Sequence, residues 1–519
     1  MNVFGWIIFV VLHALQSPVS CKSYICANEE QCITANDHQI NTEHSKAFSS
    51  LNNCRLLCGK YGPLWPRPTG YVFLGNQTIA INPWDVRFEQ TLNGETTEGK
   101  TILLEIKRYF LRNLRKDCDS TRVNENASSS PLIIKLHILS NVTTLTWHTD
   151  ESYKLIISND PHLSIVEAEI EANTIFGSRH GLESLLQLFT KVNDRNSTTF
   201  SLHIISQANI VDKPTYPHRG IMIDTARNYI PIKILKRQLD AMAASKMNVF
   251  HWHMTDTQSF PVQLEKVPEM VAYGAYSVDE VYTTNDIEQL IQYAKYRGIR
   301  VIFELDAPAH AGNGWQWGPE KGLGNLAVCV NQKPWRNFCI EPPCGQLNPT
   351  NPNMYTTLQQ IYEDLARMNK DETVMHMGGD EVFFGCWNSS SEIISYLAEH
   401  GMGRTESDFL ALWSTFQGNA FKLWQNVTST NQSITSNIAG ENVNDSPMLG
   451  ILIMVFGVKQ CIITGRRYTI TSYPKETAFW EVKFVYGQST LMDILLTDVL
   501  GHAQLPQRNV FGQILKQEL

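Results

Sequence analysis

The chain has 519 residues, of which 43 are Lys or Arg and 51 are Asp or Glu, so its formal charge at pH 7 is −8. This balance lacks the basic field of a nucleic-acid-binding protein, and no nucleic-acid partner is expected. Hydrophobic residues make up 43% of the chain and charged residues 18%, which excludes a disordered polymer and allows a large buried core.

The N-terminus has the pattern of a secretory signal peptide, which we place at residues 1–20. An apolar run, Ile7–Leu12, precedes small residues at Ser17–Ser20, and the run is too short to span a bilayer comfortably. Eight sequons support export: Asn76, Asn126, Asn141, Asn196, Asn388, Asn426, Asn431 and Asn444. We therefore expect a secreted protein, or one delivered to the lysosome or cell surface through the secretory pathway.

Cysteine spacing predicts disulfides rather than a metal site, because the compartment is expected to be oxidising. Residues 21–60 form a polar extension that contains four cysteines: Cys26, Cys32, Cys54 and Cys58. Cys339 and Cys344 could close a small loop, and Cys329 and Cys386 could join two longer loops. The connectivity is open at this point.

Residues 61–214 alternate strand and helix patterns and predict a smaller α/β domain. Leu132–Leu139 and Tyr153–Ser158 have strand patterns. Gly181–Val192 is predicted to be a helix, because its leucines recur at helical spacing. Asp212-Lys213-Pro214 is the expected exit from this domain.

Residues 215–445 repeat a strand-then-helix unit. The predicted strands are Gly220–Asp224, Asn248–Met254, Arg300–Leu305 and Thr373–Met377. The predicted helices open at Pro231, are capped at Asn285 and stopped at Gly298, and cover Tyr355–Met368. Such repeats predict an α/β fold of the (β/α)8 TIM-type barrel kind, in which the C-terminal strand ends carry the chemistry.

Each of these four strands has an acid at its C-terminal end: Asp224, Asp256, Asp306 and Asp380. One such acid could simply cap a helix or form a turn, but four in register favour a site. Asp380 is followed by Glu381, and adjacent acids at a strand end point in different directions. A desolvated Glu can then act as a general acid while a hydrogen-bonded Asp stays ionised.

Five segments together resemble the signature of family 20 glycoside hydrolases, the β-N-acetylhexosaminidases. They are His218–Gly220, Asp224–Asn228, His251–Asp256, Asp306–His310 and His376–Glu381. The form is similar to the insect branch, with Leu64-Trp65-Pro66 early in the chain and Glu341–Pro349 in a later loop. The resemblance runs from about residue 54 to about residue 425.

The resemblance implies exo-hydrolysis of terminal non-reducing β-linked GlcNAc or GalNAc, from chitooligosaccharides or N-glycans, by a retaining, substrate-assisted route. It implies that Glu381 protonates the leaving oxygen and Asp380 holds the acetamido group. Arg227 would grip sugar hydroxyls, while Asp256 and His310 would form a relay that tunes Glu381. No cofactor and no metal are implied, and a homodimer is possible.

Simpler interpretations stay open for single residues. Arg227 could pair structurally with Asp224, Asp256 could cap a loop, and His310 could be an ordinary buried histidine. Trp315 and Trp317 could line a sugar pocket or pack a lid. A metal-dependent barrel hydrolase is a further alternative, because His251-x-His253 together with His310 imitates a ligand set.

The resemblance stops after about residue 430, and residues 446–519 form a divergent tail. Codons for Met448–Gly457 and Ala478–Gln488, read one base earlier, permit segments that resemble the missing end of the family. The sequence therefore predicts a reading-frame shift and a barrel that is incomplete after about residue 430. The alternative function is a catalytically impaired, glycan-binding homologue.

Overall fold

The computed structural model describes two units of the chain. The described residues are 23–35, 48, 50–116, 118, 129–160, 162, 164–193, 199–435, 451–452, 459–463, 466–470 and 480–484. The predicted signal peptide at 1–20 and most of the tail at 446–519 lie outside them. One unit comprises residues 1–143 and 148–215, and the other comprises residues 144–147 and 216–519. Within the described part, no helix is long and apolar enough to cross a membrane.

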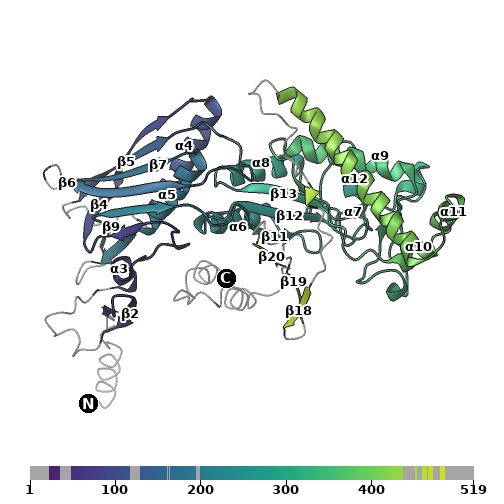
Figure 1. The fold of residues 1–519 in the computed structure, drawn as a ribbon, viewed down its shortest axis with the longest axis horizontal. Coiled ribbons are helices and arrows are strands. Elements are labelled where there is room, and N and C mark those ends of the chain that lie inside the picture. Colours follow the sequence, from purple (N-terminus) through teal and green to yellow (C-terminus); the bar gives the residue numbers. More distant parts are fainter. Residues whose placement is uncertain are drawn as a thin grey trace, which may run out of the picture. The chain divides into compact units, whose positions relative to one another are not determined.

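The first unit is a mixed eight-stranded sheet with the order β3-β10-β6-β7-β5-β4-β9-β8. Its strands are β3 (Val72–Leu74), β4 (Thr78–Leu92), β5 (Ser130–Ile138), β6 (Tyr153–Asp160), β7 (Ile165–Ala172), β8 (Phe189–Asn193), β9 (Phe200–Ile205) and β10 (Ala208–Asp212). Two helices, α4 (Thr97–Arg115) and α5 (Ile175–Gln187), lie along this sheet (Figure 1). Every second residue of β5 is buried, from Leu132 to Ile138, because alternate side chains of a strand point to one face.

The predicted strands of this unit are confirmed, but the predicted helix Gly181–Val192 is displaced. The helix α5 begins at Ile175, where the Thr174 hydroxyl accepts the backbone N–H of Gly177. It ends at Gln187, and residues Phe189–Asn193 form β8, which pairs with β9. Pairing with a neighbouring strand therefore prevails over the local helical spacing.

The N-terminal extension contains a small disulfide-bonded structure. It consists of β1 (Tyr24–Ala27), β2 (Gln31–Thr34) and α3 (Leu51–Leu57). Disulfides join Cys26 to Cys58 and Cys32 to Cys54, which resolves the connectivity left open by the sequence.

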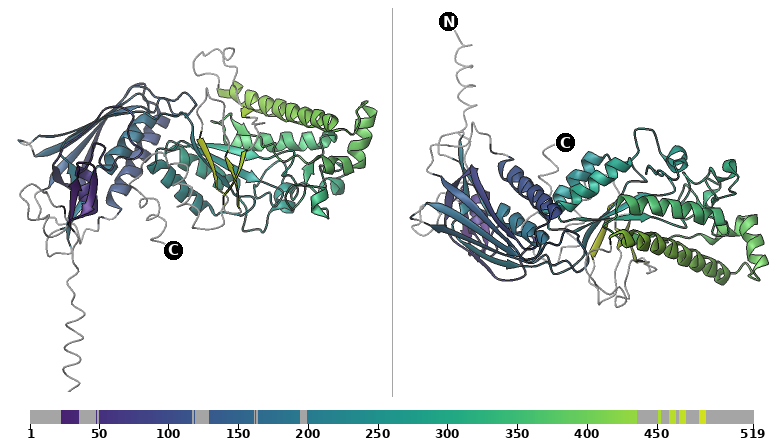
Figure 2. Two further views of the ribbon diagram at one scale, coloured as in Figure 1. Left: turned by 60° about the horizontal axis from the view of Figure 1, so that its bottom comes forward. Right: turned by 90° about the horizontal axis from the view of Figure 1, so that it is seen from above.

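The second unit is built on four consecutive parallel strands: β11 (Arg219–Asp224), β12 (Val249–Thr255), β13 (Arg300–Leu305) and β16 (Met375–His376). The helices between and after them include α6 (Ile232–Ala244), α7 (Glu269–Gly274), α8 (Thr284–Lys295), α9 (Pro352–Met368), α10 (Phe384–Ser389), α11 (Ser391–Glu399) and α12 (Glu406–Thr435). This confirms the predicted strand-then-helix repeat of a TIM-type barrel fold (Figures 1 and 2).

Short backbone strands from the tail extend this sheet at both edges. They are β17 (Ile451–Leu452), β18 (Lys459–Ile463), β19 (Arg466–Ile470) and β20 (Trp480–Phe484). The strand β17 pairs in parallel with β16, and β20 pairs in parallel with β11. The sheet order is β17-β16-β13-β12-β11-β20-β19-β18.

Two predicted boundaries in this unit are corrected. The strand predicted at Thr373–Met377 is limited to Met375–His376. The helix α8 is capped by Thr283 rather than Asn285, because Thr283 and Asp286 form a reciprocal capping box. The backbone just before β16 contacts α12, because the Trp424 indole on that helix donates a hydrogen bond to the Thr373 carbonyl at 2.8 Å.

Candidate active site

A row of alternating acidic and basic residues crosses the four parallel strands. In register, Asp224 on β11 pairs with His253 on β12, His253 with Glu304 on β13, and Glu304 with His376 on β16. The row follows from the strand period: Phe250 and Trp252 alternate with the histidines along β12 and therefore point to the other face. The sequence thus places a line of ionisable groups on one face of the sheet.

Glu304 lies at the centre of this row and contacts three histidines. Its Oε2 is 2.7 Å from His251 Nε2 and 2.9 Å from His253 Nδ1, and its Oε1 is 2.8 Å from His376 Nδ1. Burial alone would raise the pKa of Glu304, but the three histidines hold that pKa well below its usual value. Glu304 is therefore a buried carboxylate stabilised by the imidazoles around it.

Asp256, directly after β12, joins this row to the strand-end loops. Its Oδ2 lies 3.0 Å from His253 Nε2 and 2.9 Å from Arg227 Nη2, and its Oδ1 lies 3.3 Å from His310 Nδ1. Arg227 also pairs with Asp224 through Nη1 at 2.6 Å. The structural pairing expected as an alternative for Arg227 is therefore present, but the same guanidinium also reaches Asp256.

His310 lies between Asp256 and the acid pair formed by Asp380 and Glu381. Its Nε2 is 3.6 Å from Asp380 Oδ1 and 3.6 Å from Glu381 Oε2. Burial would lower the pKa of His310, but the surrounding carboxyl groups, led by Asp306 and Asp256, raise it to about 10. Its ring is therefore a cation that faces both acids.

The acid pair lies beyond the end of β16, in a turn of left-handed backbone. Gly378, Gly379 and Glu381 have φ values of +62°, +112° and +56°. Strand alternation does not apply in such a turn, and Asp380 and Glu381 both approach the same His310 nitrogen. Burial raises the pKa of Glu381, with His310 opposing and Asp380 adding to the shift. A carboxyl group of this kind can serve as a general acid.

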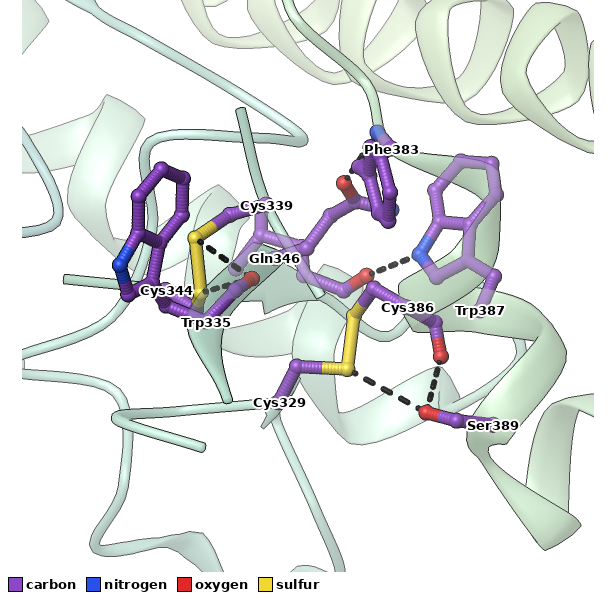
Figure 3. Close-up of a disulfide and its surroundings, with 10 residues drawn as sticks. Cys329, Trp335, Cys339, Cys344, Gln346, Phe383, Cys386, Trp387 and Ser389 are labelled. Carbon is purple, nitrogen blue, oxygen red and sulfur yellow. Dashed lines mark hydrogen bonds between the residues drawn. A yellow bond between two sulfur atoms is a disulfide. The ribbon is translucent and has the colours of Figure 1, made fainter. Parts of the chain in front are cut away.

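A disulfide fastens the segment that follows the acid pair. Cys386 on α10 is bonded to Cys329 in the long loop after β13, and Cys339 is bonded to Cys344 in the same loop (Figure 3). Both pairings suggested by the sequence are confirmed. The backbone N–H of Phe383 also donates to Gln346 Oε1 at 2.9 Å, so the loop and the segment after Glu381 are held together twice (Figure 3).

Trp315 and Trp317 lie in the long loop after β13. Both are buried, and the Trp317 indole donates to the Gly314 carbonyl at 2.8 Å.

Several buried groups here contain enough nitrogen and oxygen atoms to hold a metal ion, among them His251 with Glu304 and His376. Their atoms contact one another directly at 2.7–2.8 Å, whereas two ligands about 2.1 Å from one tetrahedral ion lie roughly 3.4 Å apart. The spacing is that of ion pairs. Among the described residues, none of these groups combines His251, His253 and His310, the set suggested for a metal-dependent hydrolase.

All five predicted site residues lie in one connected group: Arg227, Asp256, His310, Asp380 and Glu381. The sequence indicated His253 only as a possible metal ligand and indicated no role for Glu304 or His376. An ionisable residue inside an otherwise apolar strand could have pointed to them, but their contact with one another depends on the register of the strands.

Comparisons with known proteins point to one family. Residues 216–441 match the family model described as "Glycosyl hydrolase family 20, catalytic domain", and residues 64–188 match the one described as "beta-acetyl hexosaminidase like". The chain is 40% identical over 378 residues to a chitooligosaccharidolytic beta-N-acetylglucosaminidase of Bombyx mori, covering 73% of this chain and 61% of the relative. It is 38% identical over 428 residues to the protein of the same name from Ostrinia furnacalis, covering 80% and 67%.

A third relative and a solved structure agree with these matches. "Probable beta-hexosaminidase fdl" of Drosophila melanogaster is 35% identical over 401 residues, covering 70% of this chain and 58% of the relative. A chitobiase structure from Flavobacterium johnsoniae superposes with a TM-score of 0.54 at 25% identity, covering 70% of this chain and 51% of that one. The chain therefore spans about 60% of the length of the curated relatives it matches, and the catalytic-domain match ends at residue 441, just before the predicted tail.

Proposed function

Because the chain belongs to glycosyl hydrolase family 20, we propose that it removes terminal non-reducing β-linked GlcNAc or GalNAc from glycans. The observation that carries this proposal is the position of His310 Nε2, 3.6 Å from both Asp380 and Glu381. A buried cation at this point keeps two adjacent acids together at the C-terminal strand ends, where barrel enzymes hold their catalytic groups.

The two acids have different tasks in the proposed reaction. The substrate's own acetamido oxygen attacks the anomeric carbon, and Asp380 accepts the acetamido N–H and stabilises the positive charge that develops. Glu381 donates its proton to the leaving oxygen and later takes a proton from the attacking water. The raised pKa of Glu381 supports the first of these steps.

Arg227, Asp256 and His310 complete the proposed site. Arg227 carries five N–H donors, so it can pair with Asp224 and Asp256 and still offer donors to sugar hydroxyls. Asp256 holds the Nδ1 side of His310, and His310 stabilises the anionic form of Glu381 after proton donation.

Chitooligosaccharides are the first substrates to test, because two of the relatives carry that substrate in their names. N-glycans with terminal GlcNAc are the second. Export through the secretory pathway and assembly as a homodimer belong to the same proposal, and secretion assays and sedimentation of the glycoprotein test them.

The decisive experiment is hydrolysis of an aryl β-N-acetylglucosaminide by the purified full-length protein, with Glu381→Gln and Asp380→Asn alongside. The expected result is turnover that falls by about 10²–10⁴-fold in each variant. Glycan binding without turnover by the wild type would contradict this function and support the non-catalytic homologue.

A further inference from the structure

A second buried histidine lies behind the pair formed by Asp256 and His310. The side chain of His253 is fully buried, its Nδ1 lies 2.9 Å from Glu304 Oε2, and its Nε2 lies 3.0 Å from Asp256 Oδ2. Each ring nitrogen therefore faces a carboxylate oxygen, which can only accept a hydrogen bond. Both nitrogens must donate, so the ring carries two protons and a positive charge.

The surroundings of His253 favour this charge from every side. Four carboxyl groups face it: Asp224 on β11, Asp256 directly after β12, and Glu304 and Asp306 on and directly after β13. The neighbouring basic side chains lie beyond these acids: Arg227 and His310 contact Asp256, and His251 and His376 contact Glu304. Burial would lower the pKa of His253, but Glu304 and Asp224 raise it well above the usual value.

Asp256 connects this cation to the acid pair. One oxygen, Oδ2, contacts His253 and Arg227, while the other, Oδ1, lies 3.3 Å from His310 Nδ1. The charge on His253 therefore determines how much of the negative charge of Asp256 acts on His310. The far nitrogen of His310 lies 3.6 Å from Glu381, so the effect reaches the proton donor.

Resting on the proposed function, we propose that His253 is a positioning residue whose doubly protonated ring, held by Glu304, offsets the charge of Asp256 and thereby sets the pH at which Glu381 loses its proton. His253 does not reach the substrate in this arrangement. It acts through Asp256 and His310, and Glu304 acts by keeping the proton on His253.

The sign of the effect follows from the charge that is removed. In His253→Gln a cation is lost behind Asp256, so the site becomes more negative and Glu381 keeps its proton to a higher pH. The basic limb of the kcat/KM profile is expected to move up by about half to one pH unit. Glu304→Gln is expected to move the limb less than His253→Gln does, because the loss of the Glu304 anion offsets the loss of the second proton of His253.

His251→Gln is the matched control. His251 lies on the same face of β12, is buried, and contacts the same Glu304 oxygen at 2.7 Å, but it is one row farther from Asp256. Its replacement therefore disturbs the core in a similar way and is expected to move the limb by less than about 0.3 unit. Equal shifts in His251→Gln and His253→Gln, or no shift in His253→Gln, would overturn the proposal.

A second measurement does not depend on turnover. In full-length protein labelled with ¹⁵N-histidine, the ring signal that disappears in His253→Gln belongs to residue 253. It is expected to show two protonated nitrogens from pH 5 to pH 8, and to titrate within that range in Glu304→Gln. A neutral ring in the wild type would overturn the inference. If the wild type hydrolyses no aryl glycoside, the proposed function fails, while the spectrum still decides the state of this ring.

Discussion

The carboxylate of Asp306 accepts the backbone N–H of Gly379 at 3.0 Å, directly before the acid pair. The preceding residue, Gly378, lies so close that a Cβ there would meet Asp306 Oδ1 at 1.7 Å. The turn that carries Asp380 and Glu381 is therefore seated on a buried side chain from the neighbouring strand end. Its position depends on that contact as well as on its own backbone.

Gly378→Ala is expected to displace this turn. The new methyl group would collide with Asp306 and would also occupy a backbone position at φ +62°. We expect a loss of more than about 2 kcal/mol in stability and of about 10²-fold in kcat. Gly401→Ala is the control, because Gly401 has φ +70° but nothing within 4 Å of its Cβ position. It should cost about 1 kcal/mol and leave kcat unchanged. Similar losses of kcat in both variants would contradict the explanation.

Asp306→Asn is expected to change the dependence of stability on pH. Burial raises the pKa of Asp306 to about 7 in the folded protein, whereas the unfolded chain titrates near 3.8. Between these values the folded state binds more protons, so this group makes the wild type less stable as pH rises from about 4 to about 7. Asparagine removes this effect and can still accept the Gly379 N–H. Melting temperatures measured from pH 4 to pH 8 should therefore favour the variant increasingly, and a constant difference would count against the raised pKa.

Glu381→Gln and Asp380→Asn should differ in their dependence on the leaving group. A nitrophenolate departs with little protonation, so Glu381→Gln should lose less activity on the nitrophenyl glycoside than on chitobiose, by about tenfold or more. Asp380→Asn should lose a similar factor on both substrates, because it acts on the acetamido group in either case. Steady-state kcat/KM on the two substrates measures this, and the reverse pattern would exchange the two roles.

Removal of the disulfide Cys329–Cys386 should affect both stability and turnover. The bond closes a sequence separation of 57 residues, and a pair of alanines should cost about 2–4 kcal/mol. Because Cys386 shortly follows Glu381, kcat should fall as well. The control is Cys32→Ala with Cys54→Ala, in the N-terminal extension, which should lower stability there and leave kcat unchanged. Unchanged kcat in both double variants would show that the disulfide does not position the acid pair.

The sequence was most informative where a local pattern decides the structure. The strand-end acids, the apolar strands and the helix opening after Pro231 follow from residues close together in the chain, and the structure has them. The role of Glu304 could not be found in this way, because its contacts with His251, His253 and His376 depend on the register of three strands. The predicted end of the helix at Val192 is wrong for a related reason. The leucine spacing is local, whereas the pairing of Phe189–Asn193 with β9 depends on a strand farther along the chain.

The acid–base row from Asp224 to His376 also has a consequence for folding. If any one of the four strands paired one residue out of step, its ionisable side chain would turn to the other face of the sheet. Buried charges on the adjacent strands would then lose their counter-ions, at a cost of about 3–5 kcal/mol for each broken pair. The charged row around the proposed proton donor therefore also favours the correct strand register, because a misaligned sheet would be less stable than the native one even without a bound sugar.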